Sequence, residues 1–75
     1  MKDYQGTELY EGDWVALYYG YNELKTAKIT KIKEHRAKLD VYEENEVRGL
    51  VITPTKWKYG ECMIKLHESQ VPTHY

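Results

Sequence analysis

The chain has 75 residues, enough for one domain near the lower size limit for independent folding, with little room for an enclosed substrate pocket. Its net charge of −1 excludes a global field that attracts nucleic acid, and no apolar run approaches the roughly 20 residues that a membrane-spanning helix requires. The single cysteine, Cys62, excludes an intramolecular disulfide and favours a reducing compartment, so we expect a cytoplasmic domain that acts through its surface.

The start of the chain predicts a polar lead, a turn and then a strand. Residues 1–7 are polar, and Gly12-Asp13 is typical of a turn. Residues 14–19 are rich in aromatic and β-branched side chains, which predicts the first strand. Alternation along this strand predicts an inward set and an outward set: Val15, Leu17 and Tyr19 against Trp14, Ala16 and Tyr18.

A second strand is predicted over residues 24–33. Ala27 and Ile29 share one face, but Ile32 falls out of step by one residue. A bulge or sharp bend between Ile29 and Ile32 would restore the alternation. A helix is the alternative, but the positions in helical register with Leu24 form no apolar stripe, so the pattern favours a strand.

Two further strands are predicted in the middle of the chain. Residues 34–36 form a short turn, and alternation over residues 37–42 predicts a half-buried strand. Its inward residues are Ala37, Leu39 and Val41. Residues 43–46, with the sequence EENE, predict an exposed acidic loop. Residues 47–53 predict the fourth strand, and Pro54 ends it because proline has no N–H for the ladder.

The last part of the chain predicts one more strand and a tail. Residues 55–61 are irregular, with room for a helical turn, and residues 67–75 form a polar tail. Between them a fifth strand is predicted, with an inward set and an outward set: Cys62, Ile64 and Leu66 against Met63 and Lys65. Five short strands joined by turns predict an all-β fold, a small five-stranded barrel with its core at about residues 9–67.

Three successive stretches carry a resemblance to a known family: residues 12–17 (GDWVAL), 27–32 (AKITKI) and 37–41 (AKLDV). Together they resemble an SH3-like barrel of the KOW type, in which a Gly-Asp turn leads the first strand and the third strand returns as a hairpin. The resemblance implies that the chain is a single SH3-like β-barrel domain. In length and style the chain is also similar to small orphan proteins of bacteriophages, which implies an inhibitor or adaptor acting on a host protein.

Motifs for catalysis, metal binding and phosphate binding do not stand out from the sequence. Carboxylates cluster in predicted loops rather than in a cleft, which is typical of a solvated surface. Cys62, His67 and His35 are scattered and do not form the tetrahedral set that a structural zinc needs. The five glycines are spaced singly, as in turns. We therefore expect no enzymatic activity, no cofactor and no metal.

Aromatic composition points to protein binding. The chain has eight tyrosines and two tryptophans but no phenylalanine, so all its aromatic residues combine an apolar ring with a polar group. Such residues are enriched where proteins bind one another. The predicted protein-binding residues are Trp14, Tyr18, Tyr42, Trp57 and Tyr59. The aromatic face could also pair two copies of the chain, so both a monomer and a homodimer stay open.

Nucleic-acid binding is the alternative hypothesis, because basic residues gather between positions 24 and 39. If residues 24–33 and 37–42 form a hairpin, several of these cations share an outward face with Tyr42 nearby. Cations neutralise phosphates and tyrosine stacks on bases. The predicted nucleic-acid-binding residues are Lys28, Lys31, Lys33, Arg36 and Lys38.

Overall fold

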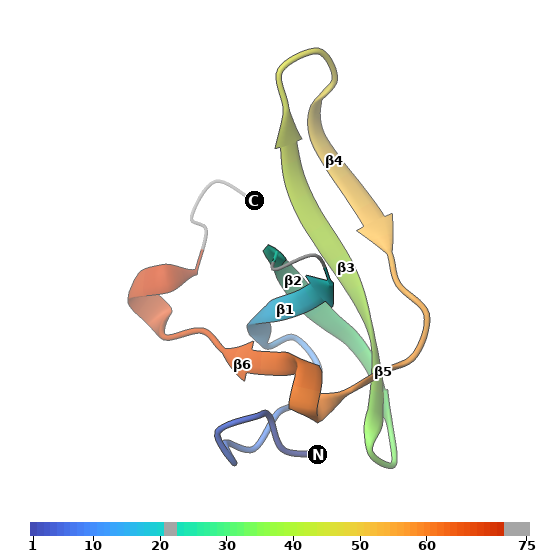
Figure 1. The fold of residues 1–75 in the computed structure, drawn as a ribbon, viewed down its shortest axis with the longest axis vertical. Helices are drawn as coiled ribbons and strands as arrows, with labels where there is room; N and C mark the ends of the chain where they lie inside the picture. Colours follow the sequence, from blue (N-terminus) through green and yellow to red (C-terminus); the bar gives the residue numbers. More distant parts are fainter. Residues whose placement is uncertain (21–22, 72–75) are drawn as a thin grey trace.

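The computed structural model describes residues 1–20 and 23–71. These residues form one antiparallel sheet with the strand order β4-β3-β2-β1-β6, and a short strand, β5, pairs with β3 (Figure 1). The strands are β1 (Trp14–Gly20), β2 (Glu23–Lys33), β3 (Arg36–Asn45), β4 (Gly49–Pro54), β5 (Lys58–Tyr59) and β6 (Met63–Lys65). Two 3₁₀ turns, η1 (Gly60–Cys62) and η2 (Glu68–Gln70), complete the described elements. The all-β prediction is confirmed, and the sheet is left open between its end strands β4 and β6.

The core lies on one face of this sheet and follows the predicted alternation. Val15 and Leu17 of β1 are fully buried, as expected, while the side chain of Tyr19 lies outside the described residues. The other buried apolar residues are Leu9, Ala27, Ile29, Ala37, Leu39, Val41 and Met63. Since β1, β2 and β3 contribute alternate residues to this core, their intervening side chains project from the opposite face.

The predicted irregularity in the second strand is present as a shift of register in β2. Ile29 pairs with Leu39, but Lys31 pairs with Lys38, so one residue of β2 is left over between them. The shift returns Ile32 to the core side, where it packs against the buried cluster. The backbone N–H of Ile32 donates to Glu11 Oε2 at 3.0 Å. The bulge therefore lets one long strand serve both ends of the core.

The predicted acidic loop over residues 43–46 is wrong, because β3 continues through Asn45. Glu43 pairs with Val51 in β4 and forms an ion pair with Lys25 of β2, which offsets its charge. The loop that follows has three residues, and Gly49 after it has a φ of 76°. This is a left-handed backbone conformation, which glycine adopts without the steric cost that a Cβ would bring. The β3–β4 hairpin, with β4 beginning at Gly49 rather than at Val47, extends as an arm beyond the core (Figure 1).

The predicted facing of the last strand is also wrong by one residue. Met63 is fully buried and pairs with Leu17, whereas Cys62, Ile64 and Leu66 are only half-buried. The cause is η1, which takes up Cys62 and sets Met63 as the first residue of β6. Side chains in a 3₁₀ turn repeat every three residues, whereas those in a strand alternate every two. Alternation counted from Cys62, which lies in the turn, therefore assigns the residues of β6 to the wrong faces.

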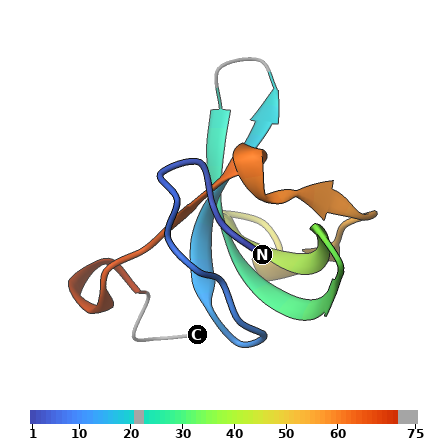
Figure 2. The same ribbon diagram turned by 90° about the horizontal axis from the view of Figure 1, so that it is seen from below.

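Residues 1–7, predicted as a loose polar lead, are instead part of the fold. Asp3 is only 6% exposed, and its carboxylate accepts hydrogen bonds from the backbone N–H groups of Gln5, Thr7 and Lys65 at 2.7–2.9 Å. The N–H of Tyr4 donates to the carbonyl of Met63. Figure 2 shows this segment running beside the part of the chain that carries η1 and β6. The N-terminal segment therefore covers the free side of β6.

Candidate interaction surface

The face of the sheet opposite the core carries most of the residues predicted to bind partners. We call it the outer face and define it by the strand residues that alternate with the core: Trp14, Ala16, Tyr18, Leu24, Thr26, Lys28, Asp40, Tyr42, Glu44, Leu50, Ile52, Pro54 and Ile64. Among the described residues no α-helix packs on this face. These side chains give the face its chemistry.

An aromatic pair lies at the centre of the outer face. The rings of Trp14 and Tyr42 have their centroids 4.8 Å apart with an interplanar angle of 56°, although β2 separates their strands. The ammonium of Lys28, on β2, lies 5.7 Å from the centroid of the Trp14 ring. An aromatic pair in this geometry contributes about 0.5–1.5 kcal/mol beyond the burial of its area. The pair therefore holds two large rings in fixed positions on a surface.

Exposed apolar side chains surround this pair. Tyr18 and Leu24 are cross-strand partners and are 49% and 61% exposed. Leu50 and Ile52, on β4, are 43% and 47% exposed, and Ile52 is the cross-strand partner of Tyr42. Monomeric proteins seldom leave a contiguous apolar patch uncovered without a function for it.

The outer face thus joins three predicted protein-binding residues, Trp14, Tyr18 and Tyr42, with three apolar residues that were missed. Leu24, Leu50 and Ile52 are aliphatic, so the aromatic composition that points to the other three residues gives no signal for them. The signal that could have found them is the alternation of side chains between the two faces of a strand. Once Tyr42 is placed outward, the even-numbered residues of its hairpin partner must point the same way.

Basic residues occupy the end of the β2–β3 hairpin beyond the bulge. Lys31 is opposite Lys38, and Lys33 is opposite Arg36. We call these four residues, together with Trp57, the basic end. The Trp57 ring lies 5.2 Å from the ammonium of Lys38 and 5.8 Å from the guanidinium of Arg36. Within residues 1–20 and 23–71, no ion pair joins any of the four cations to a carboxylate.

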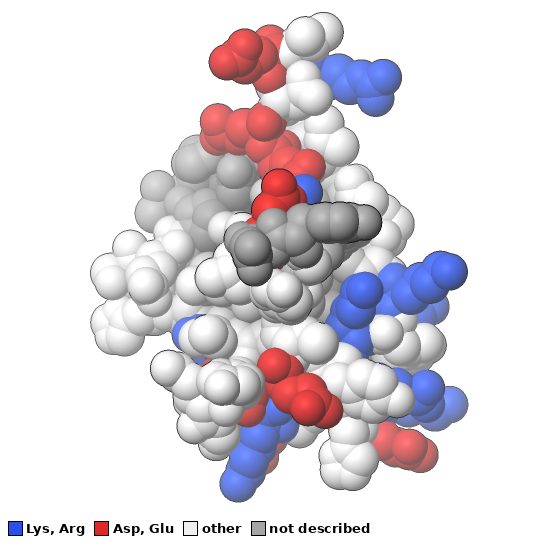
Figure 3. Space-filling model, viewed as in Figure 1, with Lys and Arg blue, Asp and Glu red and all other residues white. Residues whose placement is uncertain are grey.

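Charge is unevenly distributed over the surface. In the view of Figure 3, a group of Lys and Arg side chains lies along one side of the lower half, and acidic side chains lie along the arm as well as in the lower half. At the base of the arm Lys25 lies between Glu23 and Glu43, and the hydrogen bond with Glu43 raises the pKa of Lys25. The predicted nucleic-acid-binding residues fall into two groups, since Lys28 lies beside Trp14 and the other four lie at the basic end.

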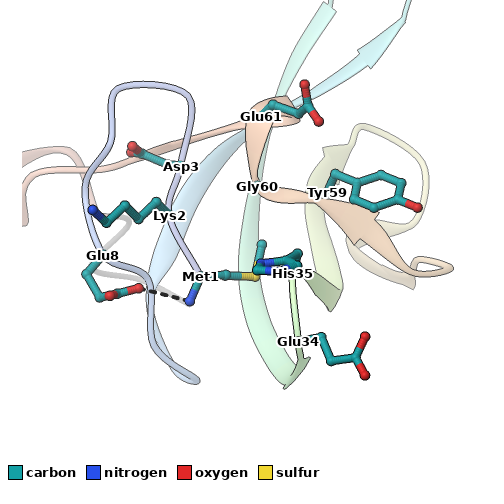
Figure 4. Close-up of a pocket in the computed structure, with 9 residues that line it drawn as sticks. All are labelled: Met1, Lys2, Asp3, Glu8, Glu34, His35, Tyr59, Gly60 and Glu61. Carbon is teal, nitrogen blue, oxygen red and sulfur yellow. Dashed lines mark ion pairs between the residues drawn. The ribbon is translucent and has the colours of Figure 1, made fainter.

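Tyr59, the remaining predicted protein-binding residue, lies apart from the outer-face aromatics in a shallow pocket of about 520 Å³ (Figure 4). The terminal ammonium of Met1 forms an ion pair with Glu8 there at 2.9 Å, and the same contact lowers the pKa of Glu8. The side chains of Glu34 and Glu61 point outward in Figure 4, so acidic groups do not converge on one reacting position.

Metal-binding clusters and membrane-spanning helices are both absent from the described residues. No three His, Cys, Asp or Glu side chains of residues 1–20 and 23–71 come close enough together to hold a metal ion. No helix in the same part of the chain has the length and apolar character needed to cross a membrane. The outer face and the basic end are therefore the surfaces that remain to be explained.

Comparison with known proteins places this chain in a family. No curated protein and no solved structure gives a significant match to the chain. Residues 1–66 match the model of a family described as a domain of unknown function (DUF7205). The match includes the N-terminal segment together with β1 to β6, so it covers the whole of the sheet. The chain therefore belongs to the DUF7205 family.

Proposed function

We propose that this domain binds a protein partner through its outer face. The observation that carries the proposal is the fixed Trp14–Tyr42 pair among exposed apolar side chains. Tryptophan and tyrosine are the residues that most often dominate the energy of a protein interface, because they bury large area at little cost in side-chain entropy. The rigid centre and exposed apolar surroundings of the outer face match that anatomy.

The charges next to the outer face indicate the character of the partner. Lys28 lies over the Trp14 ring, and the basic end continues from it along the same hairpin. A partner with an apolar ridge flanked by acidic side chains would bury the aromatic pair and oppose these cations. Such flanking charges raise the association rate and fix orientation more than they add affinity.

The same proposal covers the fold and the cellular setting. The antiparallel order β4-β3-β2-β1-β6, with a bulged second strand, supports an SH3-like barrel that stays open between β4 and β6. We place the domain in the cytoplasm as a non-enzymatic adaptor or inhibitor of the kind found among small bacteriophage proteins. The half-buried free thiol of Cys62 supports a reducing compartment.

The proposal is tested by capturing partners from the native cell lysate on the immobilised domain, with washes at low and high salt. Tyr18→Ala combined with Leu24→Ala removes exposed outer-face area and leaves the core intact, so we expect loss of capture with an unchanged circular dichroism spectrum. Val47→Ala is the matched control, because Val47 is 92% exposed at the tip of the arm. Undiminished capture by the double variant would refute the outer face as the binding surface.

Nucleic-acid binding is the second candidate, and Trp57 is the observation that favours it. Its ring lies 5.2 Å from the ammonium of Lys38 and 5.8 Å from the guanidinium of Arg36, so a base that stacked on it would have positive charge nearby for its phosphates. This reading predicts that a labelled single-stranded oligonucleotide binds in fluorescence anisotropy and is released as salt rises. Lys31→Ala with Lys38→Ala would lower the salt dependence by about two phosphate contacts. Binding that ignores salt would exclude this role.

A further inference from the structure

The two outer edges of the sheet are formed by β6 and β4, and only the first is covered. Along β6, the N–H of Lys65 donates to Asp3 Oδ2 at 2.7 Å, and the carbonyl of Met63 accepts from Tyr4 at 2.8 Å. Along β4, no hydrogen bond to the outward backbone groups is found within the described residues. An uncovered edge is a template on which another strand can pair.

The register of β3 and β4 identifies which backbone groups face the open edge. Thr55 N–H donates to the carbonyl of Leu39, which makes residues 39 and 55 a hydrogen-bonded pair. Such pairs alternate along an antiparallel ladder. The β4 residues in the intervening pairs are Leu50, Ile52 and Pro54, so their N–H and C=O groups point away from β3. Because proline lacks an N–H, the usable donors are those of Leu50 and Ile52.

The centre of β4 carries none of the features that normally protect an edge. Between Gly49 and Pro54 the strand contains no charged residue and has the sequence GLVITP. Natural edge strands are protected by lysines, bulges or short length. Gly49, with its positive φ, at one end and Pro54 at the other confine the open stretch to its central residues, Leu50, Val51 and Ile52.

We propose that β4 pairs antiparallel with β4 of a second copy of this chain, to form a two-fold dimer with one continuous sheet. A two-fold axis perpendicular to the sheet reverses the direction of β4 but leaves each side chain on the same face of the sheet. Residues that stand opposite each other must therefore both be even-numbered or both be odd-numbered. When the axis passes through Val51, Leu50 lies opposite Ile52 of the second copy, and Ile52 lies opposite Leu50 of the second copy. Both residues have open-edge groups, so each pair exchanges two hydrogen bonds.

A second copy fits this edge better than a charged partner strand. Self-pairing of an uncharged segment brings no like charges together, whereas shifting the axis to Ile52 would set Arg48 opposite Lys56 of the second copy. The Val51-centred arrangement also puts Leu50 and Ile52 side by side on the outer face. Both Trp14–Tyr42 pairs then lie on the same side of the joined sheet, so the dimer would present two copies of the outer face to a partner.

The experiment measures the mass of the full chain in solution by sedimentation equilibrium over a wide concentration range. We expect a mass twice that of one chain at high concentration, falling to that of one chain on dilution. Ile52→Pro removes the edge donor and keeps an apolar side chain, so it is expected to be monomeric. The control is Ile52→Ala, which keeps the N–H and is expected to dimerise. A single-chain mass for the wild type at every concentration would overturn the proposal.

Amide hydrogen exchange makes the test independent of any variant. In the dimer the amides of Leu50 and Ile52 should exchange about tenfold or more slowly at high protein concentration than at low concentration. The amide of Lys65, which is already bonded to Asp3, should exchange equally at both concentrations. A dimer in which the amides of Leu50 and Ile52 gain no protection would refute the β4 edge as its interface.

Discussion

The two outer edges of the sheet, formed by β6 and β4, differ in how their outward backbone groups are satisfied. On the β6 side, residues before the first strand fold back and occupy the edge, with the carboxylate of Asp3 satisfying three backbone N–H groups. On the β4 side, a hairpin arm extends from the core with no buried residue in β4. The first arrangement adds contacts to a small core. The second leaves the edge N–H groups of Leu50 and Ile52 without a partner among the described residues. If the proposals above hold, stability depends mainly on the β6 edge and binding on the β4 edge.

The largest expected effect is at Gly60, which lies where the N-terminal segment crosses η1. A Cβ added at Gly60 would come within 1.9 Å of the carbonyl oxygen of Lys2, a backbone atom that cannot turn aside. We expect Gly60→Ala to lower the free energy of unfolding by about 3 kcal/mol or more, measured by urea denaturation.

The matched control for that change is Gly12→Ala. Gly12 has a φ of 94° and no atom within 4 Å of an added Cβ, so it isolates the backbone strain of about 1–2 kcal/mol. If Gly60→Ala cost no more than Gly12→Ala, the N-terminal segment would not be held against η1 as the structure has it.

Asp3 gives the next largest effect, on the same side of the sheet. Asp3→Ala leaves the N–H groups of Gln5, Thr7 and Lys65 without their acceptor, and an unpaired buried donor costs about 1–3 kcal/mol. We expect a loss of about 2–3 kcal/mol in urea denaturation, together with faster amide exchange at Lys65. Asp40→Ala, on the outer face, is the comparison and should cost less than about 1 kcal/mol.

The core side of the fold could be predicted because it depends on local alternation. Val15 and Leu17 in β1, and Leu39 and Val41 in β3, follow a two-residue period that any strand imposes. The out-of-step position of Ile32 revealed the bulge for the same reason, since a break in the period needs a physical cause.

What the sequence did not reveal depends on contacts between distant residues. Asp3 is buried because it bonds Lys65, 62 positions away, and nothing near Asp3 in the sequence signals that partner. Glu43 stays in a strand because Lys25 lies opposite across the sheet. Trp57 was grouped with the aromatic anchors, yet the turn that follows β4 brings it to Arg36 and Lys38. In each case a contact between segments far apart in the sequence decides the neighbour, and such contacts leave no local signal.

The smallest predicted effect concerns charge at the base of the arm. The hydrogen bond with Glu43, together with the charge of Glu23, raises the pKa of Lys25 above its ordinary value of 10.5. A group whose pKa is raised by folding stabilises the folded state fully below that ordinary value, and the stabilisation is lost as pH rises through the folded-state pKa. Stability of the wild type should therefore fall slightly as the pH is raised above 10.5.

The control for this effect is Lys25→Gln, which keeps a polar, unbranched side chain one atom shorter and removes the charge. In that variant the contribution of the Lys25–Glu43 pair to the alkaline fall should be absent, so the difference in urea midpoint between the two proteins should narrow as the pH rises. The pair is exposed, and its contribution is expected to shrink further in high salt. A difference that stays constant across the alkaline range would show that the base of the arm is held by strand pairing alone.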